Sequence, residues 1–149
     1  MKDQPKLSPV ETIKTESNYL RGTIAEELAN DEPTFGKASE QLIKHHGFYQ
    51  QDDRDRRGAK DADGNPLDKA YSMMVRTKLP GGKMTAQQML DEIDLCERYG
   101  TGDLRLTDRQ GIQTHGILKE NVKATIRAIC DAQMTTLGAC GDVSRNVLC

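Results

Sequence analysis

Residues 70–118 alternate between apolar and polar side chains in a way that predicts three β-strands. The run AYSMMVRTKL at 70–79 has this alternation and ends at Pro80-Gly81-Gly82, a turn signal. Two further strands are predicted over 103–109 and 112–118, joined by a tight turn at Gln110-Gly111. Because successive side chains of a strand point to opposite faces, each strand has one side suited to a core.

Helical periodicity predicts one helix between the first two strands and another after the third. Thr85 and Gln88 form a capping-box pattern, and the helix that they begin is expected to end at Tyr99-Gly100. A second helix is predicted over 121–133, and a last strand at 135–137 would extend the sheet. The predicted inward residues are Met89, Ile93 and Cys96 in the first helix and Val122, Ile126 and Ile129 in the second.

This β-α-β-β-α order predicts an α+β protein with a ferredoxin-like antiparallel sheet and helices on one face. Before it, a capping pattern at Ser8 and apolar positions at spacing four predict an N-terminal helical arm, with helices after residue 8, over 18–29 and over 37–45. Residues 50–66 are hydrophilic and are interpreted as a loop, which we expect to be solvated over 58–66. We expect an arm and loop at 1–69, the half domain at 70–137 and the start of a further domain at 138–149, where the chain is interrupted.

The strand faces that are not suited to the core share basic and amide side chains. Ile117 would lie on this side as well, since it alternates with Gln113 and His115. Such a row suits a polyanion held by forked hydrogen bonds. The equally weighted alternative is a solvated face neutralised by the acidic loop around Asp52, Asp53 and Asp55. The predicted donors are Arg76, Lys78, Arg105, Arg109, Gln113 and His115.

Two other features bear on the chemistry of this face. A single histidine on a polar strand face forms hydrogen bonds with its neighbours more often than it binds a metal ion. We therefore expect His115 to be a hydrogen-bonding residue. Arg145, in GDVSRNV, adds a donor if the chain returns over the sheet. The four cysteines, Cys96, Cys130, Cys140 and Cys149, form no C-x-x-C pair, so free thiols are expected.

Composition excludes several classes of protein. A formal charge of −2 and only 4% aromatic residues argue against nucleic-acid binding. No apolar run approaches the roughly 20 residues that cross a bilayer. The sequence also starts without a signal peptide, so we expect a soluble cytoplasmic protein with no membrane partner.

The chain resembles the amino-terminal part of the sirohaem-containing sulfite reductases, the haemoprotein subunit of the assimilatory enzyme and its ferredoxin-dependent relatives. The resemblance runs over essentially the whole chain in several ordered blocks, so it is more specific than a single short motif. These blocks are ESNYLRGTIAEEL, HHGFYQQDDRDRR, MMVRTKLPGG, LRLTDRQGIQTHGILK and LGACGDVSRNVLC.

The resemblance implies that the basic face binds sirohaem, an iron isobacteriochlorin fringed with carboxylates. It implies that Arg76 and Arg145 contact the sulfite anion in addition to the cofactor. Arg105, Arg109, Gln113 and His115 would hold the cofactor, and Asn146 would assist near the ring. The implied reaction is the six-electron reduction of sulfite to sulfide.

The family also has a 4Fe–4S cluster, but no cysteine of this chain matches a cluster-ligand motif. With part of a sirohaem pocket and no metal ligands, the chain is expected to be inactive alone and to need the remainder of the polypeptide and a ferredoxin or flavoprotein electron donor. Three alternatives are a piece of a ferredoxin-nitrite reductase, a stand-alone anion- or tetrapyrrole-binding module without redox activity, and an RNA-binding ferredoxin-like domain.

Overall fold

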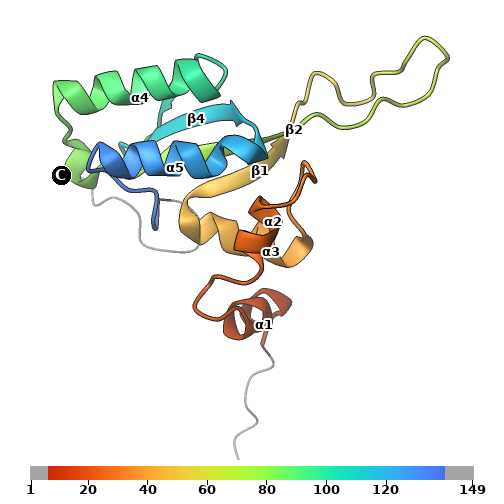
Figure 1. Ribbon diagram of the computed structural model, residues 1–149, viewed down its shortest axis with the longest axis horizontal. Coiled ribbons are helices and arrows are strands. Elements are labelled where there is room, and N and C mark those ends of the chain that lie inside the picture. The colour runs from red at the N-terminus through yellow and green to blue at the C-terminus, as the bar shows by residue number, and fades with distance from the viewer. Residues whose placement is uncertain (1–6, 140–149) are drawn as a thin grey trace, which may run out of the picture.

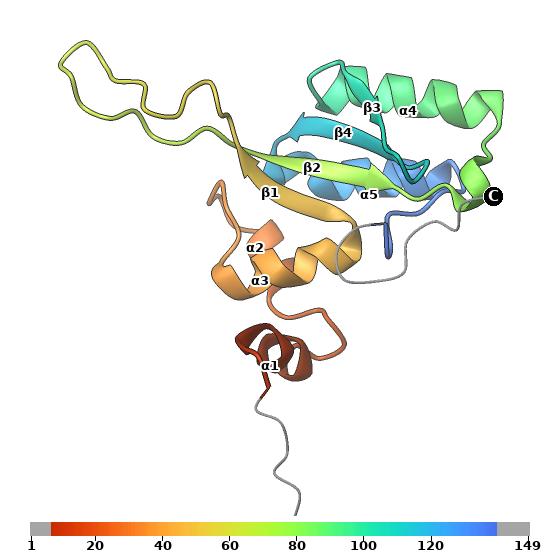
Figure 2. The ribbon, with the colours of Figure 1, turned by 180° about the vertical axis from the view of Figure 1, so that it is seen from behind.

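The protein is an α+β structure in which two helices cover one face of a four-stranded antiparallel sheet. The computed structural model describes residues 7–139 (Figure 1). The strand order is β1-β2-β4-β3, and α4 and α5 lie together on one face of the sheet (Figures 1 and 2). The predicted ferredoxin-like fold class is therefore confirmed. The strands are β1 Phe48–Asp52, β2 Tyr71–Thr77, β3 Leu104–Leu106 and β4 Ile112–Ile117, and the α-helices are α1 Pro9–Glu16, α2 Ile24–Leu28, α3 Lys37–Leu42, α4 Ala86–Tyr99 and α5 Val122–Asp131.

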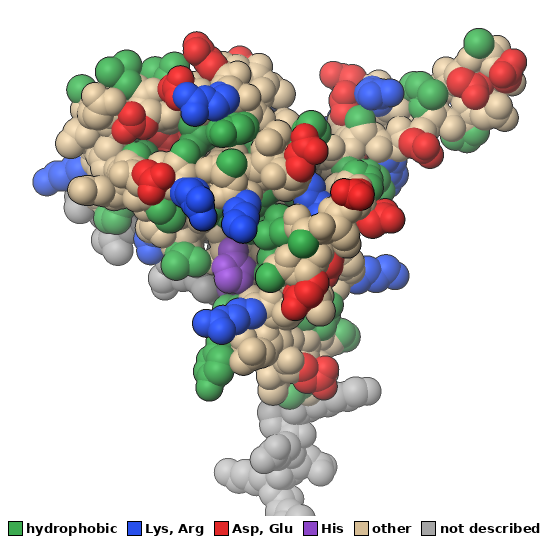
Figure 3. Space-filling model, in the orientation of Figure 1, with side chains coloured by type: hydrophobic (Ala, Val, Ile, Leu, Met, Phe, Trp, Pro, Cys, Tyr) green, Lys and Arg blue, Asp and Glu red, His purple; other side chains and the backbone are tan. Residues whose placement is uncertain are grey.

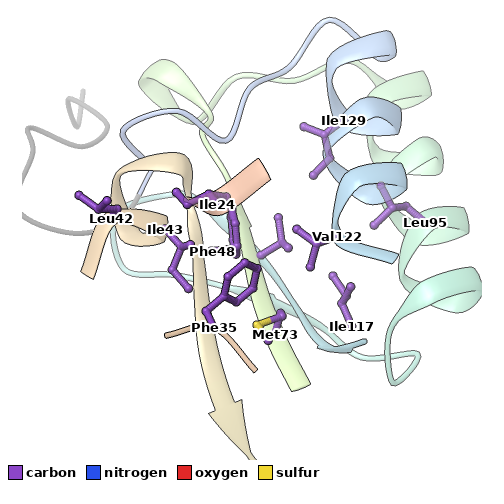
Figure 4. Close-up of a cluster of buried hydrophobic side chains, with 11 residues drawn as sticks. Ile24, Phe35, Leu42, Ile43, Phe48, Met73, Leu95, Ile117, Val122 and Ile129 are labelled. Carbon is purple, nitrogen blue, oxygen red and sulfur yellow. The ribbon is translucent and has the colours of Figure 1, made fainter. Parts of the chain in front are cut away.

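The core lies between the sheet and its helices, as the alternation predicts. Met73, Val75 and Thr77 of β2 are buried on the helix side. Val122 and Ile129 of α5 are buried against them, in agreement with the predicted inward face (Figure 4). The cluster continues toward α2 and α3 through Ile24, Phe35, Leu42, Ile43 and Phe48.

The strand β1 differs from the expectation, since residues 50–52 belong to this strand and not to the predicted loop. Gly47 has a φ of +88°, which ends the 3-10 turn Ile43–His46 and directs the chain into β1. β1 then pairs with β2 so that Phe48 lies opposite Val75. Phe48 packs against Phe35 with ring centroids 5.8 Å apart. Burial of this one aromatic side chain outweighs the polar character of the rest of the strand.

A bulge in β4 corrects the predicted position of Ile117. The register between β2 and β4 shifts between Met73 and Val75, and Gly116 there has a φ of +79°, which favours glycine. Ile117 consequently lies opposite Met73 and is fully buried in the core. The prediction that it shares the face of His115 was wrong because the bulge reverses the alternation.

The helix α4 begins and ends where predicted but is rotated about its axis. Thr85 and Gln88 form the reciprocal capping box, and Gly100 is the C-cap. The buried residues of this helix are Glu92, Leu95 and Cys96, whereas Ile93 is 38% exposed. The prediction of Ile93 as a core residue was wrong, and Leu95 takes its place.

The N-terminal segment is helical but more broken than predicted. Asn18, Tyr19 and Leu20 have φ values of 49°, 59° and 65°, so the helix expected over 18–29 is reduced to Ile24–Leu28. A buried lysine ties this segment to the half domain. Nζ of Lys119 donates to the side chain of Asn30 and to the carbonyl of Glu32, both at 2.6 Å.

Residues 53–70 form a long excursion between β1 and β2 that projects away from the rest of the protein (Figure 1). Its tip is organised by Asp61, whose carboxylate accepts from the backbone amides of Asp63 and Asn65 at 2.9 and 2.8 Å. At the other end of β2, the strand expected at 135–137 is reduced to one bridge between Lys78 and Thr135. Within residues 7–139, no helix has the length and apolar character needed to cross a membrane.

Candidate functional site

A row of hydrogen-bond donors crosses the sheet on the face away from α4 and α5. The register places Gln113 of β4 opposite both Arg76 of β2 and Arg105 of β3. Figure 2 views the molecule from this side, with the helices behind the sheet. We call this surface the arginine face and define it by Arg76, Arg105, Gln113 and His115. On the helix side, acidic and basic side chains are interspersed (Figure 3).

Arg76 is held in a defined orientation at the centre of the arginine face. With its amide oxygen turned toward the guanidinium, Gln113 accepts from Nε of Arg76 at 3.1 Å and also from Nη2. Nη1 donates to the carbonyl of Ala139 at 3.4 Å, and the guanidinium lies 5.9 Å from the ring centroid of Tyr49. These neutral partners orient the guanidinium while leaving its charge uncompensated within the described residues.

Arg109 and Lys78 reach the same end of the face from neighbouring segments. Both line a small pocket together with Arg76, Thr107 and Gly111. The hydroxyl of Thr107 accepts from the amide of Gly111 at 3.0 Å, which closes the turn between β3 and β4. The structure therefore brings together basic residues from β2, from the segment after it and from the β3–β4 turn.

His115 lies on the arginine face in a partly buried position. Its Nδ1 is 3.1 Å from Oε1 of Gln51, a β1 residue. Nε2 is buried and has no hydrogen-bond partner within residues 7–139. Burial, and after it the positive charges of Arg105 and Arg76, hold the pKa of His115 below its ordinary value.

The acidic loop is engaged with its own arginine and not with the arginine face. Asp52 accepts from Nε of Arg57 at 2.7 Å and pairs also with Nη2. The hydrogen bond from Arg57 lowers the pKa of Asp52. Asp53 accepts from the amide of Asp55 at 3.0 Å. Among residues 7–139, neither Arg76 nor Arg105 forms an ion pair, which disfavours neutralisation of their charges by Asp52.

Sequence reasoning missed two residues of this site, Tyr49 and Gln51. Both belong to β1, and in the register Tyr49 lies opposite Met74 and Gln51 opposite Ser72. The signal that identifies them is the alternation of Phe48 and Gln50 with Tyr49 and Gln51 directly after Gly47, a pattern that fits a short edge strand.

The remaining candidates are not among the residues that define the arginine face. Arg145 and Asn146 are outside the described residues, as are Cys140 and Cys149. Cys96 is buried in α4, where burial raises the pKa of its thiol, and Cys130 is exposed on α5. Within residues 7–139, no group of His, Cys, Asp and Glu side chains is arranged to hold a metal ion.

Comparison with known proteins gives this arrangement a family context. Residues 66–132 match the family model described as "Nitrite/Sulfite reductase ferredoxin-like half domain". The chain is 49% identical to the "Sulfite reductase [NADPH] hemoprotein beta-component" of Anoxybacillus flavithermus over 144 residues, covering 95% of this chain and 25% of that protein. The protein of the same name from Shouchella clausii is 52% identical over 143 residues, covering 95% of this chain and 24% of that protein.

Two further similarities extend to a yeast and to a solved structure. The "Sulfite reductase [NADPH] subunit beta" of Schizosaccharomyces pombe is 48% identical over 149 residues, covering 99% of this chain and 10% of that protein. The solved structure described as "Structure of Mycobacterium tuberculosis NirA protein" is similar to this chain, with a TM-score of 0.75 and 26% sequence identity. The similarity covers 95% of this chain and 27% of the chain in that structure.

The chain spans about a quarter of the length of its bacterial relatives. The family match and the identities agree on one assignment. The chain corresponds to the N-terminal region of the sulfite reductase hemoprotein beta-component and carries the nitrite/sulfite reductase ferredoxin-like half domain.

Proposed function

We propose that this chain forms part of a sulfite reductase haemoprotein in which the arginine face binds sirohaem and the sulfite anion. The observation that carries the proposal is the row Arg105–Gln113–Arg76 across three neighbouring strands. Three donors fixed by backbone register on a sheet form a rigid platform for an anionic ligand.

The residues of the arginine face fit a ring fringed with carboxylates. Guanidinium groups match carboxylates with forked hydrogen bonds, and Arg76 has no acidic partner among the described residues. The unpartnered Nε2 of His115 marks a polar position that a ligand group can satisfy. On this proposal Arg76, Arg105, Arg109, Gln113 and His115 hold the cofactor, together with Arg145 and Asn146.

Bound sirohaem would supply the iron at which sulfite undergoes its six-electron reduction to sulfide. Arg76 is the described residue that we assign to the sulfite anion, and Arg145 is the second. Because Arg76 is already oriented by Gln113 and Ala139, it stabilises negative charge on sulfite without reorganising.

The described residues do not fit a 4Fe–4S cluster. Cys96 is buried within α4 and Cys130 is exposed on α5. A cluster is held by several thiolates at one place. On our proposal the cluster ligands come from the remainder of the polypeptide, electrons come from a ferredoxin or a flavoprotein, and this chain alone does not reduce sulfite.

A sirohaem titration of the purified chain tests the proposal. We expect weak, salt-sensitive binding, because one half of a pocket supplies part of the contacts. The double substitution Arg76→Gln/Arg105→Gln should abolish the absorbance change. Arg127→Gln, an exposed arginine on α5, is the matched control and should bind as the wild type does. Equal binding by the double variant would overturn the role of the face, and a tight stoichiometric complex would overturn the need for a second half.

The assignment of Arg145 is tested in a complete enzyme that contains this region. Arg145→Ala should lower sulfite turnover far more than sirohaem content, since a substrate contact is not needed to retain the ring. Turnover is measured by sulfide production and cofactor content by absorbance of the purified enzyme. An equal loss of both would assign Arg145 to the structure of the cofactor pocket instead.

A further inference from the structure

The two ring nitrogens of His115 have different surroundings, and this difference determines where the ring carries its proton. Nδ1 lies 3.1 Å from Oε1 of Gln51, and an amide oxygen accepts hydrogen bonds but does not donate them. The neutral ring therefore carries its proton on Nδ1. Nε2 is then a bare acceptor, buried and without a partner within residues 7–139.

The charged groups that act on this ring are of one sign. Arg76 comes from β2 and Arg105 from β3, the strands on either side of β4. β1 contributes the neutral amide of Gln51. Burial and the two guanidinium charges hold the pKa of His115 below its ordinary value of 6.5, so the ring is neutral at neutral pH in the free protein.

A carboxylate bound beside these arginines changes that balance in two ways. Its negative charge offsets the repulsion that Arg76 and Arg105 exert on a protonated ring. It also presents lone pairs to Nε2, and these repel the lone pair of a neutral ring but accept a hydrogen bond from Nε2–H. Both effects favour the imidazolium form once the anion is present.

We propose that His115 takes up one proton at Nε2 when a carboxylate ligand binds the arginine face, while Gln51 keeps the other proton on Nδ1. The proton comes from solvent, the ring becomes an imidazolium, and Nε2–H donates to the bound carboxylate. Gln51 is a positioning residue in this scheme, because it keeps a proton on Nδ1 and so leaves Nε2 as the nitrogen that titrates. The inference rests on the proposed function and adds a proton to the binding equilibrium.

The first test reads the tautomer of the free 149-residue chain by long-range ¹H–¹⁵N NMR of the histidine ring. We expect the Nδ1–H tautomer in the wild type at pH 7.5. Gln51→Leu removes the acceptor and should abolish the preference for Nδ1–H. A wild-type ring with its proton on Nε2 would overturn the proposal without reference to any ligand.

The second test uses uroporphyrin, a metal-free ring fringed with carboxylates, as the probe between pH 6 and 8. Uptake of one proton makes the apparent Kd fall by up to about tenfold for each unit of pH decrease between the free and bound pKa values. NMR should show His115 protonated in the complex. In His115→Gln, the apparent Kd should lose the part of its pH dependence that comes from this histidine. Binding with a neutral His115 overturns the coupling alone. A complete absence of binding overturns the proposed function and the coupling together.

Discussion

The two faces of the sheet are made by alternate residues of the same strands, yet they satisfy different physical requirements. On the helix side Val75 and Ile117 are almost fully buried. On the arginine face Arg76 and Arg105 have no ion-pair partner there, and Nε2 of His115 has no hydrogen bond. The helix side is held by buried apolar side chains, whereas the arginine face keeps two guanidinium charges without an acidic partner among the described residues.

The largest expected difference between the faces is in the cost of removing an aromatic side chain of β1. Phe48→Ala deletes a ring that is 2% exposed and should lower the free energy of unfolding by about 3–5 kcal/mol. Tyr49→Ala, the next residue on the opposite face, should cost about 1 kcal/mol. Urea denaturation measures both, and equal losses would show that the two faces contribute alike.

A cation on the packed side should behave differently from those on the arginine face. Lys119 is 5% exposed, with two hydrogen bonds to residues 30–32 and the ring of Phe35 5.2 Å away. Lys119→Ala should cost about 2 kcal/mol, because it leaves the partner oxygens unpaired. The control Lys123→Ala, on the exposed side of α5, should change the unfolding free energy by less than about 0.5 kcal/mol. A cost for Lys119→Ala as small as that of the control would contradict its role as a tether.

A buried acid on the helix side should give stability a pH dependence. Burial raises the pKa of Glu92 above its ordinary 4.5, and the nearby Thr77 hydroxyl only partly offsets this. Since the folded pKa exceeds the unfolded one, this contribution to stability is present below pH 4.5 and is lost as pH rises through the folded pKa. At high pH, the free energy of unfolding of Glu92→Gln should exceed that of the wild type by on the order of 1 kcal/mol.

Denaturation curves from pH 4 to 8 check this prediction. The exposed Glu97→Gln on the same helix is the control and should keep the wild-type profile. A wild-type stability that does not decline relative to Glu92→Gln would show that folding does not raise the pKa of Glu92.

The smallest expected effect on stability is that of Arg105→Gln. Because Arg105 is exposed and unpaired within residues 7–139, its loss should change the unfolding free energy by less than about 0.5 kcal/mol. It should nevertheless raise the pKa of His115, since one repelling charge is removed. NMR titration of the histidine ring measures the shift, and Arg127→Gln should leave that pKa unchanged.

Much of the fold could be predicted because its signals are local. The period of β2, the capping box at Thr85 and the stripe of Val122 and Ile129 in α5 are each contained in a few consecutive residues. The row of basic residues followed from the same alternation. That these basic residues lie side by side on one face was a hypothesis, and the register of β2, β4 and β3 supports it.

The predictions that were wrong or incomplete share a cause. Contacts between segments far apart in the chain determine each of these features. β1 exists because Phe48 and Phe35 are buried together, although most of its residues are polar. Ile117 reaches the core through a bulge at Gly116 that periodicity does not reveal. The rotation of α4 depends on its contacts with α5 and the sheet, and the pairing of His115 with Gln51 joins residues 64 positions apart.

By itself, the amino-acid sequence determined the order of the elements of the half domain, the face of β2 that is buried and the concentration of basic side chains on the other, because these follow from repeat periods within short segments. The tertiary structure decided which strands are neighbours, which side of α4 is buried, and which donors have partners. Those properties depend on contacts between segments far apart in the chain, where the burial of a few side chains outweighs local preference.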